Sequence, residues 1–289
     1  MNPRNLISTS RSRIVASVLS VFCLAPLLFA PAQAADKLKI EKGDHIVLLG
    51  SGMASRMMHF NHFETELYLR FPDADLVIRN MGDEGNTPGF RPHPSRNYEE
   101  QFAFPGAKGL VNPAFLTNSK PQGHFETPDQ WLSRLGADTI IAFFGFNSSF
   151  EGPEGLDRYK KELEAFLVHT LAQKYNGESA PQLALVSPTA FENLSGTYDV
   201  PDGKKENENL ELYTAASKEI AEKNKVLFID AFTASKEWFE EGKEYTIDGA
   251  QLSDLGYQSL APVLADAIFG EAKTDEGSRT GIHAAVTDK

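Results

Sequence analysis

The chain has 289 residues, and its 28 lysines and arginines stand against 40 aspartates and glutamates, a formal net charge of −12 at pH 7. So acidic a surface repels nucleic acid and anionic lipid, which argues against both as partners. The length suffices for one well-filled α/β domain and is marginal for two. The only cysteine, Cys23, lies near the N-terminus, so the rest of the chain forms no disulfide and offers no thiol nucleophile.

The first 34 residues have the three zones of a secretory signal peptide. Arginines at the start precede an apolar run over residues 14–30, and Ala32 and Ala34 form a small-residue cleavage site. A membrane anchor is the rival interpretation, but the run is interrupted by polar residues and is shorter than the roughly 20 residues that span a bilayer. We therefore expect export to the periplasm or the medium, with residues 1–34 removed and no stable membrane insertion of the mature chain.

Five short runs rich in Val, Ile, Leu and Phe recur after this segment. They lack the in–out alternation of a half-solvated sheet, which predicts strands covered on both faces, as in a parallel sheet between two layers of helices. The runs cover residues 45–49, 76–79, 139–144, 183–186 and 226–229.

Amphipathic segments lie between most of these runs. Over residues 156–171 the apolar positions advance by three or four, which places them along one helical stripe. The segment 127–136 contains both ends of a helix, with Thr127 as N-cap, Gln130 closing a capping box and Gly136 as the stop. The alternation of strand and helix predicts an α/β fold, a three-layer α/β/α sandwich around a five-stranded parallel sheet.

Two segments do not fit this alternation of predicted strands and helices. Residues 87–126 contain six prolines and little periodicity, which is typical of a lid or a binding loop; a domain boundary is the alternative. The tail over residues 271–289 is polar and rich in small residues, so we expect it to be disordered. Residues 35–270 are thereby assigned to a single domain.

The loops that follow the predicted strands carry the candidate site, because ligands of open parallel sheets bind outside the carboxyl ends of the strands. In chain order these loops read "LLGSGMASRM", "RNMGDEGNTP" and "FFGFNSSF", and "TIDGAQLSDLGY" follows late in the chain. The set resembles the four sequence blocks of the SGNH, or GDSL-type, hydrolases, over nearly all of the mature chain up to Phe269. It looks like the SGNH domains of large exported proteins from planctomycete-type bacteria. The resemblance implies a flavodoxin-like fold and a site of the kind that hydrolyses esters.

Two blocks match the family's pattern. In the second, "NMGDEGNT" is similar to Asn-x-Gly-x-x-Gly-x-Thr, which implies that Gly85 supplies an oxyanion-hole amide. In the third, "GFNSS" implies that Asn147 adds a side-chain donor. Small residues and short amides at strand ends can point N–H groups at one developing oxyanion. The alternative is that Gly85 forms a turn and Asn147 caps a helix.

The first block departs from the family at its nucleophile. The ungapped match puts Gly52 where the family has the nucleophilic serine, and glycine has no hydroxyl. The Gly52 N–H would still face an anion, at the positive end of a helix that begins near Met53. Ser51 and Ser55 are the nearby hydroxyls, and each is a candidate nucleophile if the turn shifts by one residue.

The last block departs at its base. The family's Asp-x-x-His supplies the base and its orienting carboxylate; Asp248 keeps the carboxylate, but Gln251 replaces the imidazole. A carboxamide has no useful basicity near neutral pH, and loss of the base alone typically lowers the rate by a factor of about 10² to 10⁴. Loss of nucleophile and base together disables the covalent route.

Other histidines offer two alternatives. His59 and His62 stand three positions apart on a predicted helix, a spacing that permits joint metal ligation, but no third ligand is identifiable. We therefore predict no metal site and no cofactor. His93 and His124 lie in the proline-rich loop, from which either could reach the site as an unorthodox base.

These residues lead to a main hypothesis and two alternatives. The main one is an exported SGNH-like module that lacks the Ser–His pair and binds an acylated or carbohydrate ligand. The first alternative is an active esterase or deacetylase that uses Ser51 or Ser55 with His93 or His124. The second is a structural accessory protein with a vestigial pocket. The sequence makes no prediction of oligomeric state.

Overall fold

The computed structural model describes residues 36–92, 96–116 and 125–289. Residues 34–289 form one compact unit. The predicted signal peptide and the loop histidines His93 and His124 lie outside the described residues.

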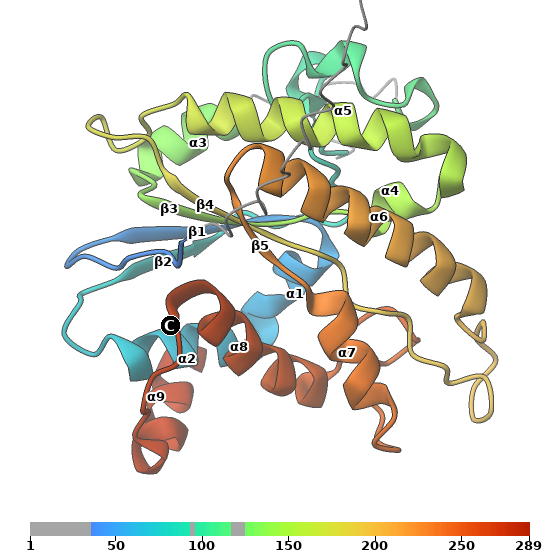
Figure 1. Ribbon diagram of the computed structural model, residues 1–289. Helices are drawn as coiled ribbons and strands as arrows, with labels where there is room; N and C mark the ends of the chain where they lie inside the picture. Colours follow the sequence, from blue (N-terminus) through green and yellow to red (C-terminus); the bar gives the residue numbers. More distant parts are fainter. Residues whose placement is uncertain (1–35, 93–95, 117–124) are drawn as a thin grey trace, which may run out of the picture. The chain divides into compact units, whose positions relative to one another are not determined.

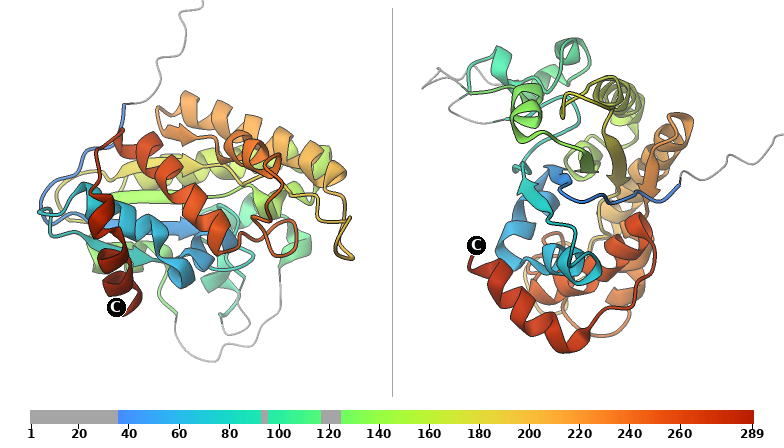
Figure 2. Two further views of the ribbon diagram at one scale, coloured as in Figure 1. Left: turned by 90° about the horizontal axis from the view of Figure 1, so that it is seen from below. Right: turned by 90° about the vertical axis from the view of Figure 1, so that its left-hand side faces the viewer.

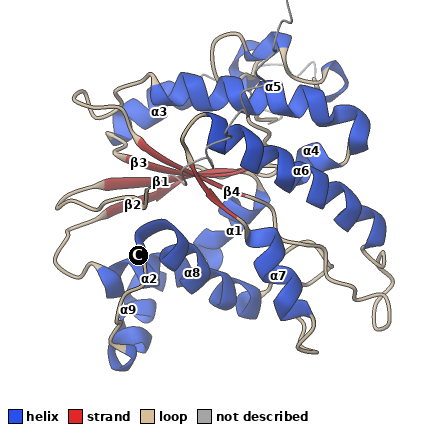
Figure 3. Ribbon diagram, viewed as in Figure 1, coloured by secondary structure: helices blue, strands red, loops and turns tan. Residues whose placement is uncertain are grey.

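A five-stranded parallel sheet lies at the centre of this unit (Figure 3). Its strands are β1 (His45–Gly50), β2 (Val77–Asn80), β3 (Thr139–Phe143), β4 (Gln182–Val186) and β5 (Leu227–Ile229). They are hydrogen-bonded in the order β2-β1-β3-β4-β5, and each neighbouring pair is parallel. This is the flavodoxin-like order, which reverses direction between β1 and β3. The predicted five-stranded parallel sheet is thereby confirmed.

Different helices cover the two faces of the sheet (Figures 1 and 2). One face carries α3 (Pro128–Leu135), α5 (Gly152–Leu171) and α6 (Lys204–Lys223). The other carries α1 (Gly52–Phe60), α2 (His62–Arg70), α7 (Ala231–Phe239) and α8 (Asp254–Phe269). Alternate residues of β1 enter the two cores, Val47 on the first face and Ile46 on the second. The three-layer sandwich follows from this burial on both faces, as predicted.

Helix α3 shows that local sequence determines where a helix begins and ends. The Thr127 side chain accepts from the Gln130 N–H, and the Gln130 side chain accepts from the Thr127 N–H, which completes the predicted capping box. Gly136 ends the helix in the left-handed conformation. Both predicted ends are confirmed.

The described part of the proline-rich segment packs into the core instead of lying free on the surface. It contains the 3-10 helices Glu99–Gln101, Ala107–Gly109 and Pro113–Phe115. Phe90 and Phe102 pair as an isolated bridge and are buried with the residues of α5. Buried Glu162 of α5 accepts hydrogen bonds from the Gly89 N–H (2.6 Å) and the Thr87 hydroxyl. Aromatic burial and one carboxylate therefore anchor this segment to α5.

The tail after Gly270, predicted to be disordered, contains the helix α9 (Glu276–Thr287). Asp275 caps it by accepting from the Gly277 N–H. The helix packs on α2 through polar contacts: Arg279 pairs with Glu66, and the His283 ring stacks on His62 with centroids 4.6 Å apart. The prediction failed because charge and ring contacts with α2, a distant segment, hold this helix, and its own sequence has few apolar residues to signal burial.

Membrane spans were sought among the described residues, and none of their helices combines the length and the apolar character that a crossing requires.

The backbones of β1 and β3 are packed tightly at the end of β1. Gly50 has φ +132°, and a Cβ placed there would lie 2.2 Å from the Phe143 carbonyl oxygen. We expect Gly50→Ala to lower the free energy of unfolding by about 3 kcal/mol or more, from backbone strain and overpacking together. Gly43 is the control, because its φ is +87° but nothing lies within 4 Å of its added Cβ. Gly43→Ala should cost only about 1–2 kcal/mol. Equal losses for the two variants in urea unfolding would contradict this account.

The contact between α9 and α2 should weaken in acid. Burial, and next the charge of His62, lower the pKa of His283; Asp254 opposes this shift and Arg279 adds to it. The docked helix thus favours the neutral imidazole, so this stabilisation is complete above the ordinary histidine pKa of about 6.5 and is lost as the pH falls below it. We expect amides of α9 to lose hydrogen-exchange protection between pH 7.5 and pH 5.5, after correction for intrinsic rates. Amides of α8 serve as the control, and His283→Gln should remove the pH dependence.

Candidate active site

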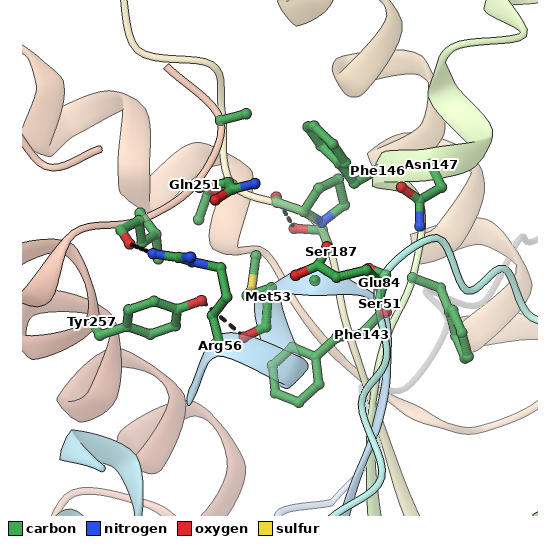
Figure 4. Close-up of a pocket in the computed structure, with 16 residues that line it drawn as sticks. Ser51, Met53, Arg56, Glu84, Phe143, Phe146, Asn147, Ser187, Gln251 and Tyr257 are labelled. Atoms are coloured by element: carbon green, nitrogen blue, oxygen red, sulfur yellow. Dashed lines mark hydrogen bonds between the residues drawn. The ribbon is translucent and has the colours of Figure 1, made fainter. Parts of the chain in front are cut away.

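A cavity of about 70 Å³ lies at the carboxyl ends of β1, β3 and β4, where the strand order reverses (Figure 4). Its walls come from the loops after these strands, from the loop after β2 and from the turn before α8. The polar residues among its lining are Ser51, Gly52, Arg56, Glu84, Asn147, Ser187, Thr189, Gln251 and Tyr257. Four of the seven residues that the sequence singled out, Ser51, Gly52, Asn147 and Gln251, thus meet in one cavity.

Gly52 is the first residue of α1, so the position of the family's nucleophile lies at a helix N-terminus. A Cβ added there would be 2.5 Å from an Oε2 oxygen of Glu84. The Glu84 side chain is exposed, so its carboxylate is free to move aside. The space in which a serine hydroxyl would stand is therefore occupied by a carboxylate of the neighbouring loop.

Ser51 and Ser55 occupy different surroundings. Ser51 is buried at the cavity wall, and its hydroxyl donates to the Phe143 carbonyl at 3.3 Å. Ser55 lies one helical turn later and is not part of the cavity lining. A third hydroxyl, that of Ser187, donates to the Pro188 carbonyl and accepts from the backbone N–H groups of α7, so its hydrogen-bonding capacity is used.

The second and third loops are tied together behind the cavity. The Asn147 side chain donates to the Asn86 carbonyl at 2.8 Å, and the Asn86 side chain donates to the Gly50 carbonyl at 3.0 Å. Gly85 has φ +77° and an added Cβ would lie 2.9 Å from Pro92, so it serves a tight turn. Asn147 lines the cavity and Gly85 does not. Their proposed oxyanion roles stay predictions.

The last loop places Gln251 in the cavity and Asp248 outside it. One Asp248 oxygen accepts from the backbone N–H groups of Ala250 (2.9 Å) and Gln251 (2.7 Å). Buried Glu192 accepts from the Thr246 N–H and hydroxyl and so fixes the start of the same turn. Within the described chain the Gln251 side chain makes no hydrogen bond. The carboxylate therefore shapes the turn, and the amide points into the cavity.

The sequence reasoning missed five polar residues of the cavity lining: Arg56, Glu84, Ser187, Thr189 and Tyr257. Glu84 falls between the two matching glycines of the second block, and its position before Gly85 was the only available signal. Arg56 and Tyr257 lie outside any motif; the Tyr257 hydroxyl donates to the Met53 carbonyl at 3.0 Å. Burial raises the pKa of Tyr257, so this phenol is neutral at physiological pH. The packing of α1 against α8 brings Arg56 and Tyr257 together, and the loop after β2 adds Glu84.

The histidines that the structure describes lie away from this cavity. His62 contacts Asp254 at 2.7 Å and stacks on His283, and His169 contacts Asp129 at 2.9 Å. His59 is exposed. No group of three or more His, Cys, Asp or Glu side chains suited to a metal ion occurs in the described ranges.

Comparison with known proteins defines the class of fold. No protein-family model and no curated protein matches the chain. Solved structures that match include an acetylxylan esterase and an α/β hydrolase, and at their low sequence identities the likeness shows the fold alone. The chain therefore has the α/β fold of these hydrolases.

Three of these structures illustrate the likeness. Acetylxylan esterase Axe2 from Geobacillus stearothermophilus is 16% identical with a TM-score of 0.56, over 83% of this chain and 100% of that chain. LAE5, an α/β hydrolase enzyme from the metagenome of Lake Arreo in Spain, is 14% identical with a TM-score of 0.54, over 81% and 99%. BT4096, a gut microbial diltiazem-metabolizing enzyme, is 15% identical with a TM-score of 0.56, over 82% of this chain and 48% of that chain.

Axe2 also has catalytic mutants, in which a serine, an aspartate or a histidine is replaced by alanine. The aspartate and the histidine stand three positions apart in that protein.

The turn before α8 allows a test of the role of Asp248. We expect Asp248→Ala to lower the free energy of unfolding by about 1–2 kcal/mol, because two backbone N–H groups lose their acceptor. Asp248→Asn keeps an oxygen at the same place and should stay within about 0.5 kcal/mol of the wild type. Thermal or urea unfolding of both variants measures this difference. An unchanged stability for Asp248→Ala would show that the carboxylate does not hold the turn.

Proposed function

We propose that this protein is an exported binding module on an SGNH-type esterase fold, which holds an acylated or carbohydrate ligand without hydrolysing it. One observation carries the proposal: Gly52 and Gln251, at the places of the family's nucleophile and base, line the same cavity. The spacing of Asp248 and Gln251 equals that of the catalytic aspartate and histidine of Axe2, which supports this match. The proposal that the protein is exported rests on the signal-peptide pattern of residues 1–34.

The chemistry of the cavity argues against covalent catalysis. An acyl transfer needs a hydroxyl that attacks and a base that takes its proton. The Ser51 hydroxyl donates to a main-chain carbonyl, and no histidine of the described ranges lines the cavity. The Glu84 carboxylate beside Gly52 would repel an oxyanion that formed there. The bonded Ser51 hydroxyl, the lack of a described imidazole and the nearby Glu84 carboxylate together support a module that does not use the acyl-enzyme route.

The size and lining of the cavity support a short group as the part of the ligand that enters. One water needs roughly 10–15 Å³ measured in this way, so about 70 Å³ accommodates a group of the size of an acetyl. Phe143, Phe144 and Phe146 supply apolar contacts, and Gln251 supplies an amide. A sugar ring would remain at the mouth while its acyl substituent entered.

A second candidate function is an active esterase with Ser51 as nucleophile. It is favoured by the position of Ser51 at the cavity wall and by the esterases among the similar structures. It requires a base from His93 or His124, both outside the described residues.

An ester assay separates the two functions. We expect the wild-type protein to hydrolyse p-nitrophenyl acetate no faster than buffer does and to take up no fluorophosphonate label, because both reactions need an activated serine. Turnover and labelling that disappear in Ser51→Ala would establish the esterase instead.

Two double variants test whether Gly52 and Gln251 are the reason that the protein does not hydrolyse esters. The double variant Gly52→Ser/Gln251→His restores hydroxyl and imidazole on the two sides of the cavity, and we expect ester hydrolysis at least about 10²-fold above wild type. Gly52→Ser/Gln251→Asn is the matched control, since it has the hydroxyl without a base and should stay near the wild-type rate. Equal rates for the two variants would mean that these positions do not face each other as nucleophile and base.

A further inference from the structure

Arg56 lines the cavity, and the described residues use only part of the hydrogen-bonding capacity of its guanidinium. Its Nε is buried without a hydrogen-bond partner, its Nη2 makes a long 3.5 Å hydrogen bond to the Leu252 carbonyl, and its side chain also interacts with the Tyr257 hydroxyl. The guanidinium lies over the Phe60 ring, 5.7 Å from its centroid. This ring contacts the flat face of the guanidinium and accepts no hydrogen bond from the N–H groups at its edge. Arg56 forms no ion pair within the described residues. A guanidinium with donors to spare is suited to a carboxylate, which it can bind in a two-pronged geometry.

The start of α1 adds further donors on the same wall. Ser51 does not cap the helix with its side chain, and no acidic residue lies in the first turn. Across the described ranges, the N–H groups of Gly52 and Met53 have no hydrogen-bond acceptor. Gln251 supplies a side-chain amide that is likewise unused. These donors and the positive end of the helix dipole favour a negatively charged group.

Glu84, labelled in Figure 4, is the only acidic residue among the described residues of the lining. Its carboxylate lies beside Gly52. Its side chain is exposed and forms no ion pair with a described residue. The chain therefore places an exposed carboxylate of its own against the helix N-terminus, where it would compete with an anion from outside.

We propose that the cavity binds the carboxylate group of a small acid or a sugar acid, and that Glu84 acts as a displaceable internal competitor for this site. The ligand carboxylate accepts from the Arg56 edge and the first amides of α1, and Gln251 donates from the opposite side. This inference rests on the proposed function, since it names the ligand group held by a cavity that does not cleave esters.

Titration with acetate tests the site, with saturation-transfer NMR at fixed ionic strength as the measurement. A single carboxylate on an acidic protein should bind with a Kd on the order of millimolar. Glu84→Gln should tighten acetate binding by about 10-fold, because a charged competitor becomes neutral, and Arg56→Gln should weaken it by about 10-fold or more. Arg56→Lys keeps the charge but loses the two-pronged geometry, so its affinity should lie between these values.

Two control variants each remove one charge, of an arginine or of a glutamate, at a position outside the cavity. Arg79→Gln and Glu178→Gln change exposed residues outside the cavity and should leave acetate binding within about 2-fold of wild type. If Arg56→Gln fails to fold, as judged by its unfolding transition, Arg56→Lys and Glu84→Gln decide the matter.

Neutral analogues of the two acids show whether binding depends on the carboxylate group. Acetamide in place of acetate, and D-glucose in place of D-glucuronate, should bind much more weakly than the corresponding carboxylate. Binding of acetate identifies a short free acid as sufficient, and binding of glucuronate alone identifies a sugar acid. Either result supports the proposal if the Arg56 and Glu84 effects accompany it. Equal binding of neutral and charged analogues, or no binding of either acid, overturns it.

The two proposals fail separately. Ester turnover by the wild type would remove the proposed function and leave a carboxylate site intact. Failure to bind either acid, together with inactivity toward esters, would remove only the carboxylate site.

Discussion

The backbone at the end of β1 holds the site together. The Gly50 carbonyl accepts from the Asp83 N–H at 2.9 Å and from the Asn86 side chain at 3.0 Å, which fixes the second loop. One residue on, the Ser51 N–H donates to the Phe143 carbonyl at 3.0 Å, which fixes the third. Because a side chain at Gly50 would collide with Phe143, this junction requires glycine. Three loops from distant parts of the chain therefore converge on one cavity.

The electrostatics of that cavity differ from those of an oxyanion site. A hydrolase arranges donors around a developing negative charge and places the nucleophile among them. Here donors line the cavity at Arg56 and at the start of α1, a carboxylate of Glu84 lies beside Gly52, and Gly52 and Gln251 stand at the predicted positions of the hydroxyl and the imidazole. Such a site is better suited to holding a stable anion than to stabilising a transient one, which agrees with the proposed binding module.

Much of the fold was predictable because its signals are local. Continuous apolar runs showed the strands, and the ends of α3 were visible in Thr127, Gln130 and Gly136. The helix α9 was not predictable, since contacts with α2 hold it and its own pattern is polar. In the site, the sequence indicated Gly52 and Gln251 through their departure from a family motif, but Arg56 belongs to no motif and Glu84 occupies a variable place within one.

The sequence by itself determined the class of fold and the order of the candidate loops, and it predicted Gly52 and Gln251 at the motif positions of serine and histidine, because each of these is a property of residue type and spacing. Only the tertiary structure decided which candidates share a cavity and which charges face it. Asp248 caps its own turn, Gly85 lies outside the cavity, and Arg56 and Glu84 enter it. The physical reason is that side-chain direction at a strand end depends on how adjacent loops pack, and those loops are far apart in the chain.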